Sequence, residues 1–534
     1  MKFGVYPAYI GGRDITGENA QFVHTITARA LIEDTFPSLG LKRDLDLGIV
    51  DPRSAGNRVV GACVVADDAL ANLALESAAL AAPAWGRFPL ADRLEIGHGI
   101  ARRLQEHSEP LVEILVAEGM PRSSAEGMIM GIPYTSWSRE TLEWCAEQLE
   151  FRRRDGDREM VLRRIPDGVV CINPPQNAAM VNALNGLTAM LAGNAMVVRA
   201  PRGVALSCMY AMREVVAPAL EEAGAPAGTV NAFCGAPMLD TWLASEHVND
   251  IIYFGGSKKG LEFEGEAIAA GKKPILELAG NDCCVVWRDA DLDAAVETIT
   301  QFFMNSGQIC NVPNQVVAHP AIADELIERL VQATKKIKPG YPDEVGVVLT
   351  PVLGVDWFFG CLGEALAKGA KLVHGGRRLE VDGSPSSTGF FVEPSIVRVE
   401  GLKDARSLSV VRDETFFPLL PIIVPEVATS DDDLLDEVLE FVNSNAYHLR
   451  NSVWTTGSAT IERFLDGITN GGNLKINDSH SGFLPFLPNQ GGAGLTGGAF
   501  GEASHPMLRT TRYQGVSVVR PAHSARQADK EHGS

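Results

Sequence analysis

One segment of the chain carries a side chain that could act as a nucleophile. Cys310 lies in the sequence NSGQICN, a small, polar turn that follows an amphipathic segment. A thiol is the best nucleophile among neutral side chains, because a little thiolate is present at neutral pH. A cysteine of this kind is also commonly buried and inert. The fragment alone therefore makes Cys310 a candidate nucleophile and leaves the structural interpretation open.

A second segment places a carboxylate in an apolar surrounding. Glu277 lies in PILELAGND, where an apolar run of strand length leads into a turn of small residues. Burial would raise the pKa of this carboxyl group and make it a plausible general base. Pairing with a distant arginine or lysine is the alternative, and the segment does not decide between the two.

Two further turns follow predicted strands. Asn177, in NPPQNA, could donate its side-chain amide to a developing oxyanion, or could simply cap the turn. In YFGGSKKG, the residues Gly255, Gly256 and Ser257 connect a strand to the start of a helix. Such a turn presents backbone N–H groups and a hydroxyl to a phosphate. This turn is not GxGxxG, and alone it is weak evidence for a nucleotide site.

The elements that would position these turns alternate along the chain. Helical spacing predicts helices over 66–84, 182–192, 204–223, 258–270, 292–304 and 323–336, with two more over 90–118 that are broken near Pro110. Apolar runs predict strands over 168–173, 195–199, 229–233, 251–254, 283–287 and 315–319. Uniformly apolar strands that alternate with amphipathic helices indicate an α/β fold with a parallel sheet covered on both faces. The segment 18–50 is not assigned.

Composition narrows the class of protein. The 534 residues carry a formal net charge of −20, which argues against a nucleic-acid partner. The nine cysteines include no CxxC pair and no cluster with metal-ligand spacing, so we expect no metal site and a reducing, cytoplasmic location. The start of the chain lacks the pattern of a signal peptide. The uncharged run 168–198 contains adjacent prolines and several amides, which argues against a membrane span.

The order and spacing of these segments resemble the aldehyde dehydrogenase superfamily, and the resemblance extends over about 51–521. The matching motifs are PQN (175–177), RAPR (199–202), FGGS (254–257), ELAG (277–280), GQIC (307–310) and ETFFP (414–418). The resemblance implies an aldehyde dehydrogenase-like α/β fold with several parts. These are a Rossmann-type cofactor domain (51–146 and 167–276), an α/β catalytic domain (277–479), a small β bridging and oligomerisation domain (147–166 and 500–521), an N-terminal extension (1–50) and a disordered tail (522–534).

The resemblance also implies the chemistry, the oxidation of an aldehyde to a carboxylic acid with NAD or NADP. Cys310 would attack the aldehyde to form a thiohemiacetal, whose oxyanion Asn177 and the backbone N–H of Cys310 would hold. After hydride transfer, Glu277 would activate water to hydrolyse the thioester. Glu414 would hydrogen-bond the nicotinamide ribose, and Phe416 would pack nearby.

Departures at the cofactor site favour NADP. In RAPR, Arg199 takes the position of the family's lysine and Arg202 that of a glutamate that would repel a 2′-phosphate. Two guanidinium groups suit a phosphate dianion, so we predict that NADP is preferred over NAD. The alternative is that Arg202 points into solvent.

Departures at the substrate pocket concern its size and polarity. The family commonly places bulky apolar side chains after the amide turn, whereas this chain has Ala178, Asn182 and Asn185 there, and Asn311 follows the cysteine. We therefore predict a wider, more polar entrance and a substrate larger or more polar than a short aliphatic aldehyde. The segment 484–498, LPFLPNQGGAGLTGG, also differs from the family pattern, so substrate specificity does not transfer from relatives.

Three other functions are weighed against this one. A CoA-acylating dehydrogenase would not need Glu277 to activate water. A non-catalytic scaffold on the same fold would not need the cysteine, glutamate and asparagine together. A thiol hydrolase would need a histidine partner for Cys310, and no segment supplies one. We expect a small-molecule aldehyde as substrate, a homodimer or homotetramer, and neither a nucleic-acid nor a membrane partner.

Overall fold

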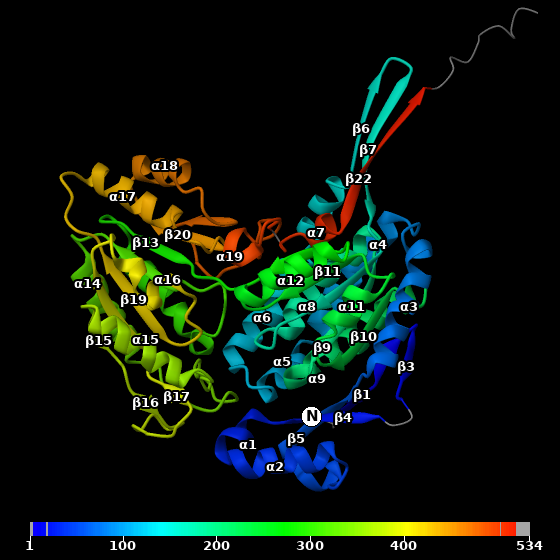
Figure 1. Cartoon of the computed structure of the whole chain (residues 1–534), viewed down its shortest axis with the longest axis horizontal. Coiled ribbons are helices and arrows are strands. Elements are labelled where there is room, and N and C mark those ends of the chain that lie inside the picture. Colours follow the sequence, from blue (N-terminus) through cyan, green and yellow to red (C-terminus); the bar gives the residue numbers. More distant parts are fainter. Residues whose placement is uncertain (1–3, 18–19, 502, 520–534) are drawn as a thin grey trace, which may run out of the picture.

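The computed structural model describes residues 4–17, 20–501 and 503–519. Figure 1 shows two α/β units side by side, with an arm of strands rising from the larger one. The predicted disordered tail, 522–534, lies outside the described residues. The α/β class is confirmed by both units. The predicted domain boundaries stay a prediction.

The larger unit is built on a sheet of ten strands in the described part of the chain. Its main path runs β1-β5-β10-β9-β8-β11-β12, and every pair along this path is parallel. The strands on this path are β1 (Gly4–Tyr6), β5 (Val59–Val65), β8 (Val169–Asn173), β9 (Ala195–Pro201), β10 (Val230–Gly235), β11 (Asp250–Phe254) and β12 (Lys273–Glu277). The remaining strands are β2 (Ala8–Ile10), β3 (Arg13–Ile15) and β4 (Gln21–Ile26).

Both faces of this sheet are buried. Along β8, Val170 and Ile172 enter one hydrophobic core, whereas Val169 and Cys171 enter the other. The helices of this unit are α1 (Ala28–Glu33), α2 (Thr35–Asp46), α3 (Asp68–Trp85), α4 (Leu90–Glu106), α5 (Ser108–Ala117), α6 (Arg122–Tyr134), α7 (Arg139–Glu147), α8 (Ala179–Leu187), α9 (Ala205–Tyr210), α10 (Ala217–Glu222), α11 (Leu239–Ala244), α12 (Ser257–Ala269), α19 (Gly494–Gly497) and α20 (Pro506–Arg509). Because side chains alternate across a strand, two apolar faces require helices on both sides.

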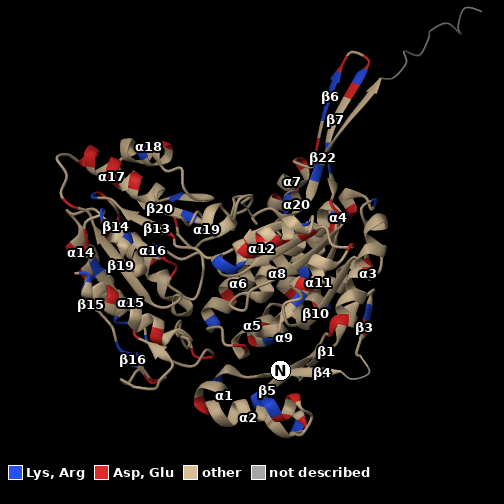
Figure 2. Cartoon of the chain, viewed as in Figure 1, with Lys and Arg blue, Asp and Glu red and all other residues tan. Residues whose placement is uncertain are grey.

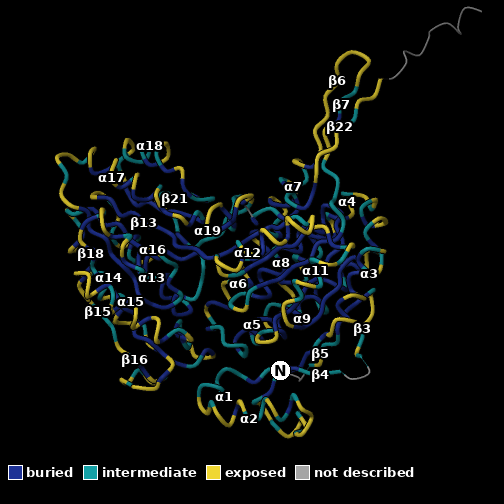
Figure 3. Tube along the Cα trace, viewed as in Figure 1, coloured by how far each residue is buried: buried dark blue, intermediate teal, exposed yellow. Residues whose placement is uncertain are grey.

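The smaller unit repeats this construction around a seven-stranded sheet, ordered β15-β18-β19-β14-β13-β20-β21 among the described residues. Its strands are β13 (Cys283–Val286), β14 (Gln315–Ala318), β15 (Lys371–His374), β18 (Ser395–Glu400), β19 (Leu419–Val424), β20 (Arg450–Trp454) and β21 (Asn473–Ile476), with a separate pair β16 (Arg378–Leu379) and β17 (Phe391–Val392). Its helices are α13 (Leu292–Thr300), α14 (Ala323–Thr334), α15 (Val355–Ala367), α16 (Ser409–Arg412), α17 (Asp431–Asn443) and α18 (Ser458–Gly467). Figure 3 shows β13, an inner strand of this sheet, in the colour of buried residues, whereas the edge strand β15 is largely exposed.

The arm consists of three antiparallel strands, β6 (Glu150–Asp155), β7 (Arg158–Pro166) and β22 (Thr511–Val519). Every residue of β6 is exposed, and the ribbon colours of Figure 2 mark basic and acidic residues along the arm. The predicted bridging segments 147–166 and 500–521 thus meet in one small sheet. Their role in oligomerisation stays a prediction.

Several expected elements differ from the observed ones. The break within 90–118 falls at His107, because Pro110 lies in the first turn of α5, where a proline is tolerated. The α-helix expected over 292–304 ends at Thr300, and a 3-10 turn continues from Gln301 until the backbone leaves helical geometry at Met304. The unassigned segment 18–50 supplies β4, α1 and α2. The helical run 202–222 is long and apolar enough to cross a membrane, but 67% of its apolar window is buried, as in a core helix.

Candidate active site

Cys310 differs from the other cysteines in its exposure. It is half-buried, whereas the eight others are buried, among them the strand residues Cys283 and Cys284. The turn before it contains two residues in the left-handed region, Asn305 with φ 50° and Ser306 with φ 56°. Such backbone is costly for residues other than glycine and persists only where surrounding contacts hold it. The chain therefore maintains a strained turn directly before its one partly exposed thiol.

Contacts from the smaller unit hold this turn. Asn305 donates its backbone N–H to the carbonyl of Val348 at 2.8 Å, and Ser306 Oγ donates to the carbonyl of Thr350 at 2.7 Å. Gln308 Nε2 donates to Thr350 Oγ1 at 2.9 Å. The segment 348–350 therefore fixes the turn on one side and leaves Cys310 on the other.

The amide turn approaches the cysteine turn from the larger unit. Asn177 follows β8, and its Nδ2 donates to the backbone carbonyl of Gln308 at 3.2 Å. Gly280 lies against the same turn, because a Cβ added to it would be 2.1 Å from the carbonyl oxygen of Cys310. The sequence-predicted Asn177 and Cys310 are thus brought together, although 133 positions separate them in the chain.

Glu277 ends β12 at the same edge of the sheet. Phe254 of β11 pairs with Glu277, and Tyr253 pairs with Asn173 of β8, so the carboxyl ends of three parallel strands are aligned there. The Glu277 side chain is buried, and its Oε2 accepts the backbone N–H of Gly491. Its Oε1 is buried without a hydrogen-bond partner among the described residues. This free oxygen can accept a proton from water or from a neighbouring thiol.

The surroundings of Glu277 and Cys310 raise the pKa values of both groups and so favour their protonated forms. Burial raises the pKa of Glu277 well above its usual value, while the Gly491 N–H and the Arg450 guanidinium oppose that shift. Burial also raises the pKa of the Cys310 thiol, and the Glu277 and Glu414 carboxyls add to the effect. The resting nucleophile is therefore a thiol, and a carboxylate with a raised pKa is a stronger base toward it.

Arg450 is a site residue that sequence reasoning missed. It is fully buried in β20, donates from Nη1 to the His480 carbonyl at 2.8 Å and from Nη2 to the Asn489 carbonyl at 2.6 Å. Its Nε lies 3.9 Å from Asp282 Oδ2. Asn489 is two residues before Gly491, so Arg450 anchors the segment that holds Glu277. The surrounding segment LRNSVW mixes polar and apolar residues, so it gives no clear signal of a buried charge.

The glycine–serine turn has the form of a phosphate site. Gly255 and Gly256 follow β11, and Ser257 begins α12, a helix of 13 residues. Ser257 Oγ is buried without a hydrogen-bond partner in the described structure. A Cβ added to Gly256 would meet no atom within 4 Å, so space is open above the helix N-terminus. Free N–H groups and an unpaired hydroxyl fit the pyrophosphate of a dinucleotide.

The two arginines of RAPR lie in different environments. Arg199 is buried, donating to Asn173 Oδ1 at 2.7 Å and to the Pro174 carbonyl at 3.0 Å, and burial lowers its pKa. Its described hydrogen bonds therefore tie neighbouring strand ends together. Arg202 is exposed and has no hydrogen bond or ion pair within the described residues. A contact of either guanidinium with a cofactor phosphate stays a prediction, and Arg202 is the freer of the two.

Glu414 contacts Gly280, the residue that lies against the cysteine turn. Its Oε1 accepts the backbone N–H of Gly280 at 2.8 Å, and burial raises its pKa to about 8. Phe416 is half-buried, and its neighbour Phe417 packs edge-on against Trp357 with ring centroids 4.9 Å apart. The predicted contacts of Glu414 and Phe416 with a nicotinamide ribose stay predictions.

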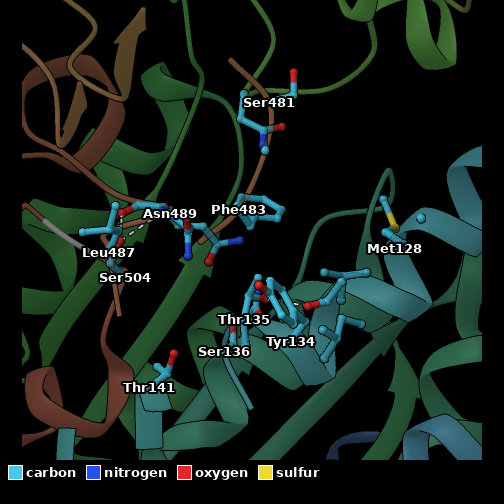
Figure 4. Close-up of a pocket in the computed structure, with 18 of the residues that line it drawn as sticks. Met128, Tyr134, Thr135, Ser136, Thr141, Ser481, Phe483, Leu487, Asn489 and Ser504 are labelled. Atoms are coloured by element: carbon cyan, nitrogen blue, oxygen red, sulfur yellow. Dashed lines mark hydrogen bonds between the residues drawn. The ribbon is translucent and has the colours of Figure 1, made fainter. Parts of the chain in front are cut away.

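A cavity of about 310 Å³ adjoins the cysteine turn. Figure 4 shows Tyr134, Thr135 and Ser136 at the end of α6 facing Leu487 and Asn489 on the segment that follows β21.

Two of the four predicted pocket residues line this cavity. Asn185 and Asn311 do, whereas Ala178 and Asn182 are absent from its walls. A role of those two residues in a substrate pocket stays a prediction. Asn182 lies behind the cavity wall, where its Oδ1 accepts a hydrogen bond from the lining residue Gln490 at 2.6 Å.

No group of three or more potential metal ligands occurs within the described ranges. The site therefore consists of a thiol, a buried carboxyl, an amide donor, a phosphate-binding turn and a cavity. This set can perform nucleophilic attack on a carbonyl, hold an oxyanion and activate water.

Comparisons with known proteins agree with this chemistry. The sequence profile described as "Aldehyde dehydrogenase family" matches residues 46–511. The chain is 30% identical over 364 residues to succinate-semialdehyde dehydrogenase [NADP(+)] of Escherichia coli, a match that covers 65% of this chain and 71% of that protein. It is 28% identical to alpha-ketoglutaric semialdehyde dehydrogenase of Bacillus subtilis, covering 61% of this chain and 65% of the relative.

The fold also matches solved structures. One is glyceraldehyde-3-phosphate dehydrogenase GapN of Methanocaldococcus jannaschii complexed with NADP, with a TM-score of 0.71 and 24% identity. That superposition covers 85% of this chain and 95% of the other. At this identity the match concerns the fold alone.

Proposed function

This chain belongs to the aldehyde dehydrogenase family, and on that premise we propose that it oxidises an aldehyde to a carboxylic acid with NADP or NAD. The convergence of Cys310, Asn177 and Glu277 at one sheet edge carries the proposal. Nucleophile, amide donor and base are the three groups that the reaction requires.

The residues divide the reaction between them. The Cys310 sulfur bonds to the aldehyde carbon as its proton passes to a base, for which the free Oε1 of Glu277 is available. Asn177 Nδ2 and the backbone N–H of Cys310 stabilise the negative oxygen. When bound, the cofactor accepts the hydride that leaves this carbon, and a thioester on Cys310 remains. Glu277 releases the first proton to solvent and then removes a proton from water, which attacks the thioester; the acid leaves and the Cys310 sulfur takes up the proton held by Glu277, which restores the thiol.

Glu277 favours hydrolysis over transfer to CoA. A buried carboxyl with a free oxygen suits the activation of water, which thioester transfer to CoA does not require. Formation of an acyl-CoA when CoA is added would instead support the acylating alternative.

For the cofactor, we propose NADP in preference to NAD. Arg202 is exposed after β9 and has no ion pair in the described structure, so its guanidinium is available to a 2′-phosphate. One comparison points the same way, since the relative from Escherichia coli is named for NADP(+). At least a tenfold advantage of NAD in kcat/KM would defeat this preference.

We further propose a cytoplasmic homodimer or homotetramer that uses the β6–β7–β22 arm for assembly. The exposed edges of this arm can pair with another chain. We also propose a substrate larger or more polar than a short aliphatic aldehyde, because Asn185 and Asn311 line a cavity of about 310 Å³.

The direct test incubates the purified chain with an aldehyde panel and each cofactor, and measures reduced cofactor and carboxylic acid. The proposal expects the two products in equal amounts. An inactive chain that binds neither cofactor would favour the scaffold alternative. Acetaldehyde or propanal as clearly the best substrate would refute the proposed substrate size.

A further inference from the structure

The cavity beside the cysteine turn has no carboxylate, ammonium or guanidinium group in its walls, since none of its lining residues within the described structure is Asp, Glu, Lys or Arg. Most hydrogen-bonding side chains there are hydroxyls and amides, such as those of Ser136, Asn185 and Asn311. The lining also includes one imidazole, that of His505, whose ring packs against Trp144 with centroids 4.8 Å apart. A substrate with an ionised tail would therefore find no carboxylate, lysine or arginine partner inside the cavity.

Arg450, the cation that acts on the Cys310 thiol, is already hydrogen-bonded to the protein backbone. Both terminal nitrogens of Arg450 donate to backbone carbonyls, of His480 and Asn489, and the side chain is 1% exposed. It lies behind the cavity wall rather than in it, because Asn489 lines the cavity and Arg450 does not. Arg450 is thus not available to a substrate carboxylate.

The carboxyl groups around Cys310 add no positive charge. Glu277, Asp282 and Glu414 lie close enough to raise the pKa of the Cys310 thiol, and Arg450 opposes them. A negative charge on the substrate would therefore meet no cation there other than Arg450, whose terminal nitrogens are already hydrogen-bonded. A cationic tail would in turn lose its hydration in a cavity that offers no carboxylate.

The rest of the wall is apolar. Met128, Ile132, Val181, Phe483 and Leu487 line the cavity together with the neutral polar groups. In Figure 4, Phe483 and Leu487 lie on one wall, with Thr135 and Ser136 opposite. An apolar substrate body that bears hydroxyl, ether or carbonyl oxygens matches this mixture.

We propose that the cavity selects uncharged aldehydes with an apolar body and neutral oxygen substituents, and rejects aldehydes with an ionised tail. This inference rests on the proposed aldehyde oxidation. It separates the chain from relatives named for semialdehydes that carry a carboxylate, such as succinate semialdehyde. Burial of an unpaired charge is what sets the discrimination.

Matched substrate pairs test this selection on the unmodified protein. Methyl 4-formylbenzoate and 4-formylbenzoate differ in one negative charge, and 4-tert-butylbenzaldehyde and 4-trimethylammoniobenzaldehyde differ in one positive charge at equal shape. We expect kcat/KM to fall about 100-fold for the charged member of each pair. A fall of less than tenfold in either pair would overturn the proposal.

A positive charge placed in the wall should weaken the rejection of the anionic substrate. In Ser136→Arg, we expect the ratio of kcat/KM for 4-formylbenzoate over its methyl ester to rise at least tenfold. The matched control is Ser458→Arg, at the exposed start of α18 outside the cavity, which should leave the ratio unchanged. An unchanged ratio in a folded Ser136→Arg protein would contradict the proposal, and the wild-type comparison decides if this variant does not fold.

The substrate pairs distinguish a failure of the proposed selection from a failure of the proposed aldehyde oxidation. A protein that oxidises the neutral members and their charged partners alike refutes the selection and leaves aldehyde oxidation standing. A protein that reduces neither cofactor with any member refutes the proposed function, and the selection falls with it.

Discussion

Gly280 offers a sharp test of how the cysteine turn is positioned. A methyl group added at this residue would lie 2.1 Å from the Cys310 carbonyl oxygen and 3.1 Å from Leu449 Cδ2. Ordinary contact begins at 3.4 Å, so the turn in Gly280→Ala must retreat by about 1 Å or more. A misplacement of roughly 1 Å can cost about 100-fold in rate.

We therefore expect kcat of Gly280→Ala to fall about 100-fold. The Gly280 N–H also donates to Glu414, so that contact should weaken as well. The assay combines steady-state kinetics with the rate of Cys310 alkylation by iodoacetamide and with the melting temperature.

The control substitution is Gly265→Ala in α12. This glycine is exposed and has no atom within 4 Å of an added Cβ, and alanine is favoured over glycine in a helix by up to about 1 kcal/mol. Its activity should stay unchanged. A Gly280→Ala protein with normal kcat, alkylation rate and stability would refute the reasoning.

Three further predictions concern single side chains. Glu277→Gln should release about one equivalent of reduced cofactor per site, more slowly than the wild type because the thiol has lost a base, and then stall because the thioester is no longer hydrolysed; sustained turnover at the wild-type rate would contradict this base. Arg202→Glu should lower the NADP-to-NAD ratio of kcat/KM at least tenfold, whereas an unchanged ratio would leave the guanidinium in solvent. Because the Glu277 pKa is raised, the rate should increase with pH above the usual carboxyl range as this group ionises. Arg450→Met removes the cation that opposes the shift, so the rising limb of the kcat–pH profile should move to higher pH; a limb that does not move would exclude this influence.

The segments that could be predicted from sequence are those whose strand, turn or helix is set by their own residues. The strand GVVCIN and the turn after it form as expected, as does the Gly255–Gly256 turn before α12. Cys310 lies in a turn that its small polar neighbours indicated. The fold class and the family are confirmed, because a buried parallel sheet and ordered motifs leave strong local signals.

The features that sequence could not give depend on distant contacts. Gly491 holds Glu277 from 214 positions away, and Arg450 anchors the same segment through the backbone carbonyl of Asn489. The cavity combines the end of α6 with the segment that follows β21, so its walls are set by tertiary packing. For the same reason, sequence could not show that Asn182 contacts this cavity only through Gln490, which donates to its Oδ1.

The most direct test of the account is the turnover of Cys310→Ala with an aldehyde that the wild-type protein oxidises. Loss of the sulfur removes the atom that must bond to the carbonyl carbon, so we expect kcat to fall by about 1000-fold or more while NADP binding is retained. Reduction of the cofactor at the wild-type rate by this variant would contradict covalent catalysis at Cys310.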